Sequence, residues 1–124
     1  PAPLRLSDGA GPPLCTVDGF PYESGRRQMR PGELLCLYTD GVDDACSAAG
    51  ERYGSERLRD ALTRYAVREP TVQRTVDAVI ADVRAFAGTA ETADDFTVLA
   101  IRWLGQPDGA LPGGTTGPGP LSGR

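Results

Sequence analysis

The sequence has 124 residues, of which 40% are hydrophobic and 24% charged, and this composition is typical of one globular domain with a single core. Its formal net charge is −4, and all 13 basic residues are arginine. Without a basic stripe, the sequence argues against nucleic acid as a partner. It has no histidine, which excludes Ser-His-Asp and Cys-His catalysis and leaves carboxylates as the plentiful catalytic groups.

Three cysteines, without C-x-x-C spacing, predict neither a disulfide framework nor a zinc site. No apolar run approaches the length needed to cross a bilayer, and no signal peptide is visible. A cytoplasmic location is therefore the default expectation.

The first third of the chain predicts a hairpin or meander followed by a buried strand. Short apolar runs at residues 4–7 and 14–17 flank turn chemistry at residues 8–13. The apolar run 34–39 lies between Pro31-Gly32 and Asp40-Gly41, which predicts a strand buried on both faces with a carboxylate at its end. An Asp-Gly pair after a strand is also an ordinary turn.

The middle of the chain predicts three helices. Asp43 or Asp44 is a candidate cap for a short helix over residues 45–49. A second helix begins near Ser55, with Leu58, Leu62 and Tyr65 on one face.

A third helix has Pro70 in its first turn and Gly88 as its C-cap. Its apolar stripe is expected to face the core and consists of Val72, Val76, Val79, Ile80, Val83 and Phe86.

The last part of the chain predicts a strand and a tail. Residues 96–104 are rich in β-branched and aromatic side chains and follow a polar loop that ends in Asp94 and Asp95. Residues 105–124 contain seven glycines and four prolines without hydrophobic periodicity, which predicts a disordered tail after a domain over residues 1–104.

Acidic residues therefore lie at the ends of two predicted strands: Asp40 follows one strand, and Asp94-Asp95 precede another. If the strands are neighbours, the carboxylates converge, and carboxylate oxygens suit Mg²⁺ or Mn²⁺. Because successive strand residues point to opposite faces, only one of Asp94 and Asp95 is expected to face the site. The alternative is that these acids are solvated loop residues.

Three motifs together resemble a known family. They read PGELLCLYTDGV at residues 31–42, GERYGSERL at residues 50–58 and ADDFTVLAI at residues 93–101. In order and spacing they resemble the C-terminal half of the metal-dependent serine/threonine protein phosphatases (PPM family) of the bacterial stage II sporulation protein E type. The resemblance covers residues 4–104.

The resemblance implies an α+β fold, a partial α-β-β-α sandwich, with a two-metal site for Mg²⁺ or Mn²⁺ at one end of its sheets. By motif matching, Asp40 and Asp94 are metal ligands, whereas Asp95 and Gly41 support the ligands without binding the ion. Thr97 takes a structural role. No residue is assigned to substrate binding.

The sequence departs from the family in two respects. The bridging aspartate, which relatives carry in a glycine-aspartate motif on an earlier strand, has no counterpart here, so we expect these residues alone to be inactive. Where relatives often have G-V-T-E-A, this chain has Gly41-Val42-Asp43-Asp44-Ala45.

The implied function is metal-dependent hydrolysis of phosphoserine or phosphothreonine on a bacterial regulatory protein of sigma-factor signalling, such as an anti-sigma factor antagonist. Two alternatives remain open: a non-catalytic phosphatase-like binding module, and a structural acidic domain.

Overall fold

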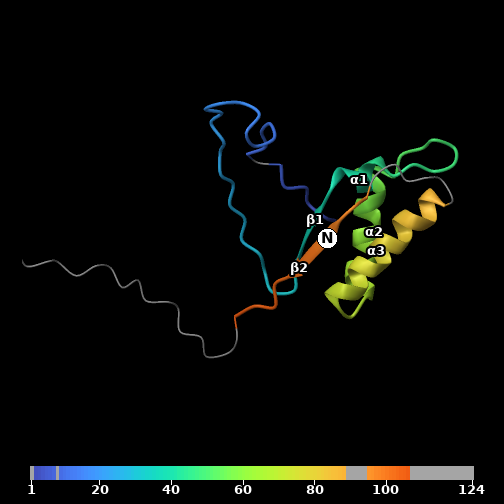
Figure 1. Ribbon diagram of the computed structural model, residues 1–124. Helices are drawn as coiled ribbons and strands as arrows, with labels where there is room; N and C mark the ends of the chain where they lie inside the picture. The colour runs from blue at the N-terminus through green and yellow to red at the C-terminus, as the bar shows by residue number, and fades with distance from the viewer. Residues whose placement is uncertain (1, 8, 89–94, 107–124) are drawn as a thin grey trace, which may run out of the picture.

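The computed structural model describes residues 2–7, 9–88 and 95–106, which contain two strands and three helices (Figure 1). In chain order these are β1 (Leu34–Tyr38), α1 (Asp40–Asp44), α2 (Gly54–Arg68), α3 (Val72–Ala87) and β2 (Val98–Arg102). The mixture of helices and a small antiparallel sheet confirms the α+β expectation. The tail prediction for residues 107–124 falls outside the described residues.

The two predicted strands form one antiparallel sheet, in which Leu35 pairs with Ile101 and Leu37 with Leu99. Both elements were expected from their apolar runs, although β2 is shorter than the run 96–104. Side chains alternate between the two faces of the sheet, and α2 and α3 lie on one face only (Figure 1). The expectation that β1 is buried on both faces is therefore wrong within this chain.

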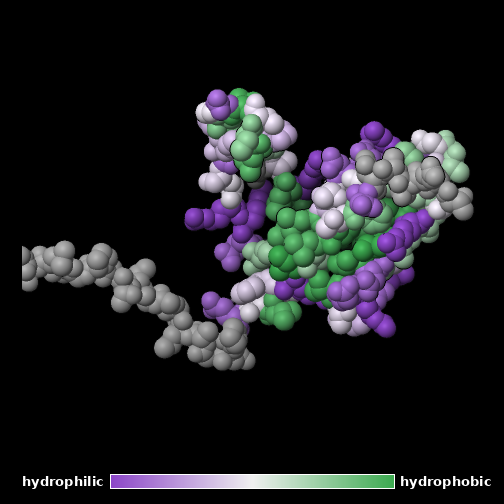
Figure 2. Space-filling view, in the orientation of Figure 1, coloured by the Kyte–Doolittle hydropathy of each residue, from purple (hydrophilic) through white to green (hydrophobic). Residues whose placement is uncertain are grey.

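The uncovered face of the sheet is apolar, and we call it the open face. It consists of Leu35, Leu37, Leu99 and Ile101. Leu37, Leu99 and Ile101 are 48%, 54% and 50% exposed. Figure 2 shows hydrophobic side chains gathered over the strands.

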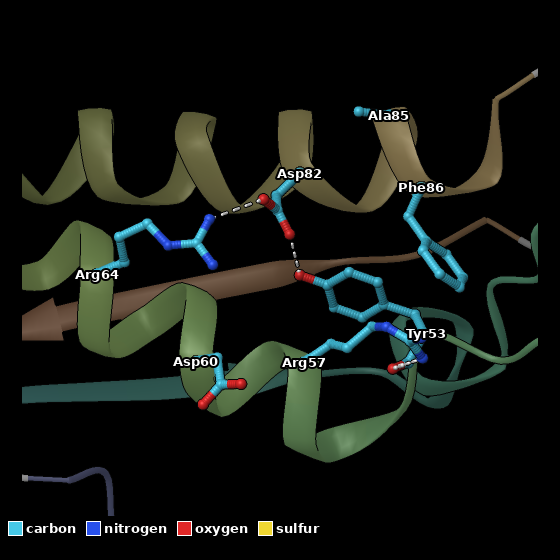
Figure 3. Close-up of a pocket in the computed structure, with 7 residues that line it drawn as sticks. All are labelled: Tyr53, Arg57, Asp60, Arg64, Asp82, Ala85 and Phe86. Atoms are coloured by element: carbon cyan, nitrogen blue, oxygen red, sulfur yellow. Dashed lines mark hydrogen bonds and ion pairs between the residues drawn. The ribbon is translucent and has the colours of Figure 1, made fainter.

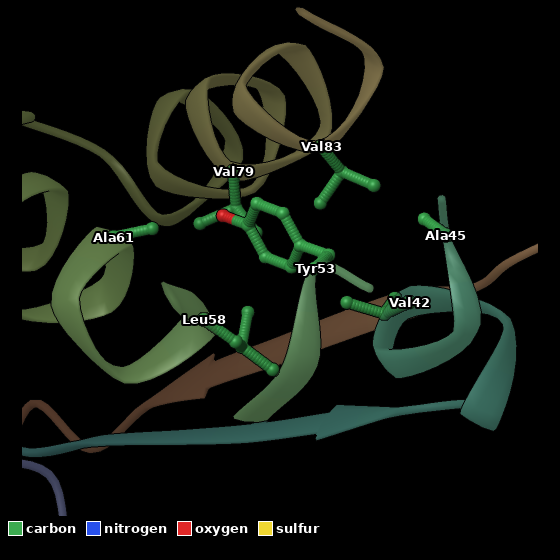
Figure 4. Close-up of a cluster of buried hydrophobic side chains, with 7 residues drawn as sticks. All are labelled: Val42, Ala45, Tyr53, Leu58, Ala61, Val79 and Val83. Atoms are coloured by element: carbon green, nitrogen blue, oxygen red, sulfur yellow. The ribbon is translucent and has the colours of Figure 1, made fainter. Parts of the chain in front are cut away.

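The core lies between the helices and the covered face of the sheet (Figure 4). Its buried side chains come from α1, the loop after it, α2 and α3: Val42, Ala45, Tyr53, Leu58, Ala61, Val79 and Val83. Leu62 and Tyr65 pack against this cluster, as their helical spacing predicted. Burying apolar side chains of this size contributes about 1.5–3 kcal/mol for each large one.

The buried line of α3 differs from the predicted stripe. Val79 and Val83 are buried as expected, together with Thr75 and Ala87, whereas Ile80 is only partly buried. Small residues take the closest positions because they let a helix approach its neighbours.

The N-terminal end of α3 differs from the prediction, whereas its C-terminal end agrees with it. Thr71 is the N-cap, because its hydroxyl accepts a hydrogen bond from the Arg74 amide at 3.2 Å, and Pro70 lies before the helix. Gly88 is the C-cap as predicted, with a φ of 61° and its amide bonded to the Arg84 carbonyl at 2.9 Å.

Two local predictions are wrong. The short helix spans Asp40–Asp44 and not residues 45–49, which enter a hairpin closed by a bridge between Cys46 and Arg52. Acidic side chains at Asp40 and Asp43 suit the first turn of a helix. Among described residues before β1 there is no strand, so runs 4–7 and 14–17 form no sheet hairpin. The leucines of these runs, Leu4, Leu6 and Leu14, are exposed.

Candidate metal centre

The ends of β1 and β2 meet at a pocket of about 400 Å³, which we call the acidic pocket. It is lined by Thr39, Asp40, Gly41, Asp44, Asp95 and Thr97. The predicted convergence of Asp40 with the acids before the second strand is thereby observed for Asp95. Asp94, the expected second metal ligand, lies outside the described residues.

Hydrogen bonds between two threonines hold the two sides of the acidic pocket together. The Thr39 amide donates to the Thr97 carbonyl at 3.1 Å, and the Thr97 amide donates to the Thr39 hydroxyl at 2.9 Å. These bonds continue the register of the sheet, so both threonines fall on the same side as Leu37 and Leu99. The acidic pocket is therefore continuous with the open face. Sequence reasoning gave Thr97 a structural role and missed Thr39 altogether.

Gly41 lies where α1 comes closest to the segment that leads into β2. A Cβ atom placed on Gly41 would be 2.6 Å from the Asp95 carbonyl oxygen and 3.0 Å from the Phe96 Cβ, distances at which the backbone would have to move. Gly41 thus brings Asp40 and Asp95 to one pocket. The close backbone approach explains why a glycine is required at this position, and the role of Gly41 beside metal ligands stays a prediction.

The donors of the acidic pocket suit a hard divalent cation, because its lining side chains offer only carboxylate and hydroxyl oxygens. Yet within residues 2–7, 9–88 and 95–106, no three acidic, cysteine or histidine side chains are close enough to hold an ion. Asp43, next to the pocket, has a buried carboxylate oxygen without a hydrogen-bond partner in that same part of the chain. The donors fit Mg²⁺ or Mn²⁺ in kind, but these residues supply only part of a coordination sphere.

Asp44 is a pocket residue that motif matching did not assign to the site. Its Oδ1 lies 3.4 Å from Nη1 of Arg52 on the following hairpin. Sequence reasoning placed Asp44 as a helix cap or as a replacement for the glutamate of relatives. Its position four residues after Asp40 was the available signal, because a helix that starts at Asp40 returns its fifth residue to the same side.

A second pocket, of about 360 Å³, lies between α2 and α3 (Figure 3). At its centre Asp82 accepts hydrogen bonds from the hydroxyls of Tyr53 at 2.6 Å and Tyr65 at 3.1 Å, and it pairs with Arg64 at 3.5 Å. Burial, and then the bond to Asp82, raises the pKa of Tyr53 well above its ordinary value. Arg57 lies over the Phe86 ring, 4.6 Å from its centre.

Asp82 and its three partners satisfy one another, so their arrangement holds the helices together. A carboxylate bonded to two phenols and a guanidinium has little capacity left for a ligand. Sequence reasoning missed this network because Tyr53 and Asp82 are 29 positions apart. The acidic pocket is therefore the better candidate for chemistry.

Three comparisons place the chain among known proteins. The family model of stage II sporulation protein E (SpoIIE) matches residues 4–104. The solved SiaA-PP2C domain of Pseudomonas aeruginosa superposes with a TM-score of 0.60 at 31% identity, over 68% of this chain and 34% of that domain. Protein IcfG of Synechocystis sp. is 28% identical over 91 residues, 73% of this chain and 14% of IcfG. The chain thus spans about a third of the solved domain and about a seventh of IcfG.

The match to the solved domain identifies the fold as part of a PP2C-type domain. No helix in the described ranges is long and apolar enough to cross a membrane.

Proposed function

Because this chain belongs to the stage II sporulation protein E family, we propose that it forms one part of the catalytic centre of a metal-dependent protein phosphatase. The substrate is phosphoserine or phosphothreonine on a bacterial regulatory protein, such as an anti-sigma factor antagonist. The observation that carries the proposal is the acidic pocket, which is lined both by Asp40, after β1, and by Asp95, before β2.

In this proposal Asp40 and Asp94 bind Mg²⁺ or Mn²⁺, while Asp95 and Gly41 position these ligands. When bound, a pair of such ions would neutralise phosphate oxygens and lower the pKa of a shared water. The chain's own contribution is geometric. Asp40 lies two residues after the end of a hydrogen-bonded strand, and the contact at Gly41 fixes its distance from the segment that carries the second acid.

The open face supplies a reason for the incomplete donor set. Thr39 and Thr97 lie on the same side of the sheet as the open face, and they also line the acidic pocket. Polypeptide that covers the open face therefore borders the pocket and is in position to add the missing ligands. The two thirds of the solved relative that this chain does not match are the natural source of such a cover. Burial of the three exposed leucine and isoleucine side chains would contribute roughly 1.5–3 kcal/mol for each.

The test compares hydrolysis of p-nitrophenyl phosphate and a phosphoserine peptide, with Mn²⁺, by these 124 residues and by a protein in which the matched domain is complete. We expect turnover only from the complete domain. Asp40→Asn and Asp94→Asn should each abolish it, because each removes a ligand and its negative charge. Asp95→Asn should reduce activity roughly 10- to 100-fold and leave a measurable rate.

Titration of Mn²⁺ into the same variants tests the assignment within the acidic pair. If Asp95→Asn lost tight Mn²⁺ binding while Asp94→Asn kept it, the roles of Asp94 and Asp95 would be reversed. Turnover by the 124 residues alone, lost in Asp40→Asn, would contradict the need for further ligands.

A non-catalytic phosphatase-like binding module is the second candidate. It is favoured by the absence, within the described residues, of a group of acids able to hold an ion. The two candidates differ in one measurement on the complete domain. A catalytic domain releases inorganic phosphate from the phosphopeptide when Mn²⁺ is added, whereas a binding module retains the intact phosphopeptide with or without the ion.

A further inference from the structure

A hairpin connects α1 and α2 (Figure 1). It holds the backbone of Arg52, whose side chain contacts Asp44 of the acidic pocket. Arg52 forms an antiparallel bridge with Cys46. The next amide, that of Tyr53, donates to the Ala45 carbonyl at 2.7 Å. The carbonyl of Arg52 itself accepts a hydrogen bond from the Arg57 guanidinium at 2.8 Å. These bonds fix the direction in which the Arg52 side chain leaves the hairpin.

The side chain of Arg52 is exposed although its backbone is held. Tyr53 points into the core and is 2% exposed, so its neighbour Arg52 points outward, with 73% of its side chain exposed. Its contact with Asp44, at 3.4 Å between Nη1 and Oδ1, engages one nitrogen of the guanidinium. A guanidinium carries five N–H donors, so most of them remain available to a further acceptor.

A cation on the rim of the acidic pocket would attract a phosphate monoester, in addition to the metal ions of the proposed function. Three carboxylates line the pocket, those of Asp40, Asp44 and Asp95, and none of its lining residues is an arginine. Arg52 forms an ion pair with Asp44, one of the carboxylates of this lining. Arginine presents paired donors that match two phosphate oxygens, and such charge-assisted bonds are stronger than neutral ones.

We infer that Arg52 binds the phosphoryl group of the substrate at the rim of the acidic pocket, and that Asp44 is its partner when no substrate is bound. This inference rests on the proposed phosphatase function and adds a substrate-binding residue to it. Binding exchanges one ion pair for another, so the guanidinium moves without breaking the hairpin that carries it. No covalent step involves Arg52.

A purely structural role for Arg52 predicts a different effect of its removal on the affinities for Mn²⁺ and phosphate. If the guanidinium only held Asp44 in place, its loss would disturb the metal-binding side of the pocket and lower the affinity for Mn²⁺. If it binds phosphate, its loss would weaken phosphate binding and leave the affinity for Mn²⁺ unchanged. Measuring both affinities in one variant therefore separates the two roles.

The experiment uses the complete domain with Arg52→Ala, Arg52→Lys and the control Arg59→Ala, which removes an exposed arginine of α2 outside the pocket lining. For each we would measure KM and kcat with a phosphoserine peptide, the inhibition constant of inorganic phosphate, and the Kd of Mn²⁺ by calorimetry. Arg52→Ala should raise both KM and the inhibition constant about tenfold, with kcat and the Mn²⁺ Kd within about twofold of wild type. Arg52→Lys should recover part of the loss, and Arg59→Ala should match wild type.

Two results would overturn the inference: weaker Mn²⁺ binding with an unchanged phosphate inhibition constant in Arg52→Ala, or no difference between Arg52→Ala and Arg59→Ala. If the wild-type domain showed no Mn²⁺-dependent turnover, the proposed function itself would fail. Calorimetric binding of inorganic phosphate to wild type and Arg52→Ala would then decide the role of Arg52. Weaker phosphate binding in the variant would support the role, and equal binding would exclude it.

Discussion

Replacing Tyr53 by phenylalanine removes one hydroxyl from the core and keeps the ring. Tyr53 is 2% exposed, its hydroxyl donates to Asp82 at 2.6 Å, and its ring meets the Phe86 ring edge-on with centres 5.4 Å apart. A hydrogen bond to a charged acceptor contributes about 1.5–3 kcal/mol. Because Asp82 keeps its bond to Tyr65 and its contact with Arg64, we expect the free energy of unfolding to fall by roughly 1.5–2 kcal/mol, the lower part of that range.

The same substitution should change the response of stability to alkaline pH. Burial and the bond to Asp82 raise the pKa of Tyr53 above that of an unfolded tyrosine, which is about 10. The stabilisation is therefore complete below about pH 10 and is lost as the pH rises from there towards the folded-state pKa, because the unfolded chain gives up its proton first. Tyr53→Phe has no such proton and should lose less stability above pH 10 than wild type.

Urea unfolding followed by circular dichroism, at pH 8 and at steps up to pH 11, measures both effects. Tyr22→Phe is the matched control, because Tyr22 is 43% exposed and donates to the carbonyls of Pro12 and Pro13 in the surface loop. We expect this control to stay within about 0.5 kcal/mol of wild type. Two results together would refute the role given to the Tyr53–Asp82 bond: equal unfolding free energies for Tyr53→Phe and Tyr22→Phe at pH 8, and an equal loss of unfolding free energy in both variants as the pH rises to 11.

Three further substitutions test the core, the pocket and the open face. Val79→Asp should lower the free energy of unfolding by several kcal/mol, on the order of 4, and Ile80→Asp by clearly less, because Val79 is fully buried and Ile80 only partly; equal losses in urea unfolding would contradict this. Gly41→Ala should weaken Mn²⁺ binding by the complete domain roughly 10- to 100-fold in calorimetry, since the added Cβ displaces the segment at Asp95, and unchanged affinity would disprove it. Leu37→Asp should change the stability of the 124 residues by less than about 0.5 kcal/mol yet inactivate the complete domain, and full activity would show that the open face is not covered there.

Sequence patterns predicted the larger elements because their periodicity and stop signals are local. The apolar runs gave β1 and β2, the spacing of Leu58, Leu62 and Tyr65 gave a face of α2, and Gly88 marked the end of α3. The short helix at Asp40 was missed because an Asp-Gly pair after a strand also fits a turn, and only the contact with the Asp95 segment decides between them.

Features that depend on distant parts of the chain could not be read from the sequence. The buried line of α3 passes through Thr75 and Ala87, which a search for large apolar residues overlooks. The pocket role of Asp44 depends on where a five-residue helix begins. Within the acidic pair, the expectation that only one of Asp94 and Asp95 faces the site stays a prediction, and so does the assignment of Asp94 as a ligand.

The pairing of β1 with β2 has a kinetic consequence. Tyr38 pairs with Val98, about 60 residues later in the chain, and closing a flexible loop of that length costs roughly 3.6 kcal/mol of entropy beyond a constant. Helices α2 and α3 are neighbours in sequence, separated only by residues 69–71, so their contact closes a much shorter loop. We expect the helical pair to form first and shorten the path between the strands. Substitutions between the helices should then slow folding, whereas substitutions in the sheet should mainly speed unfolding.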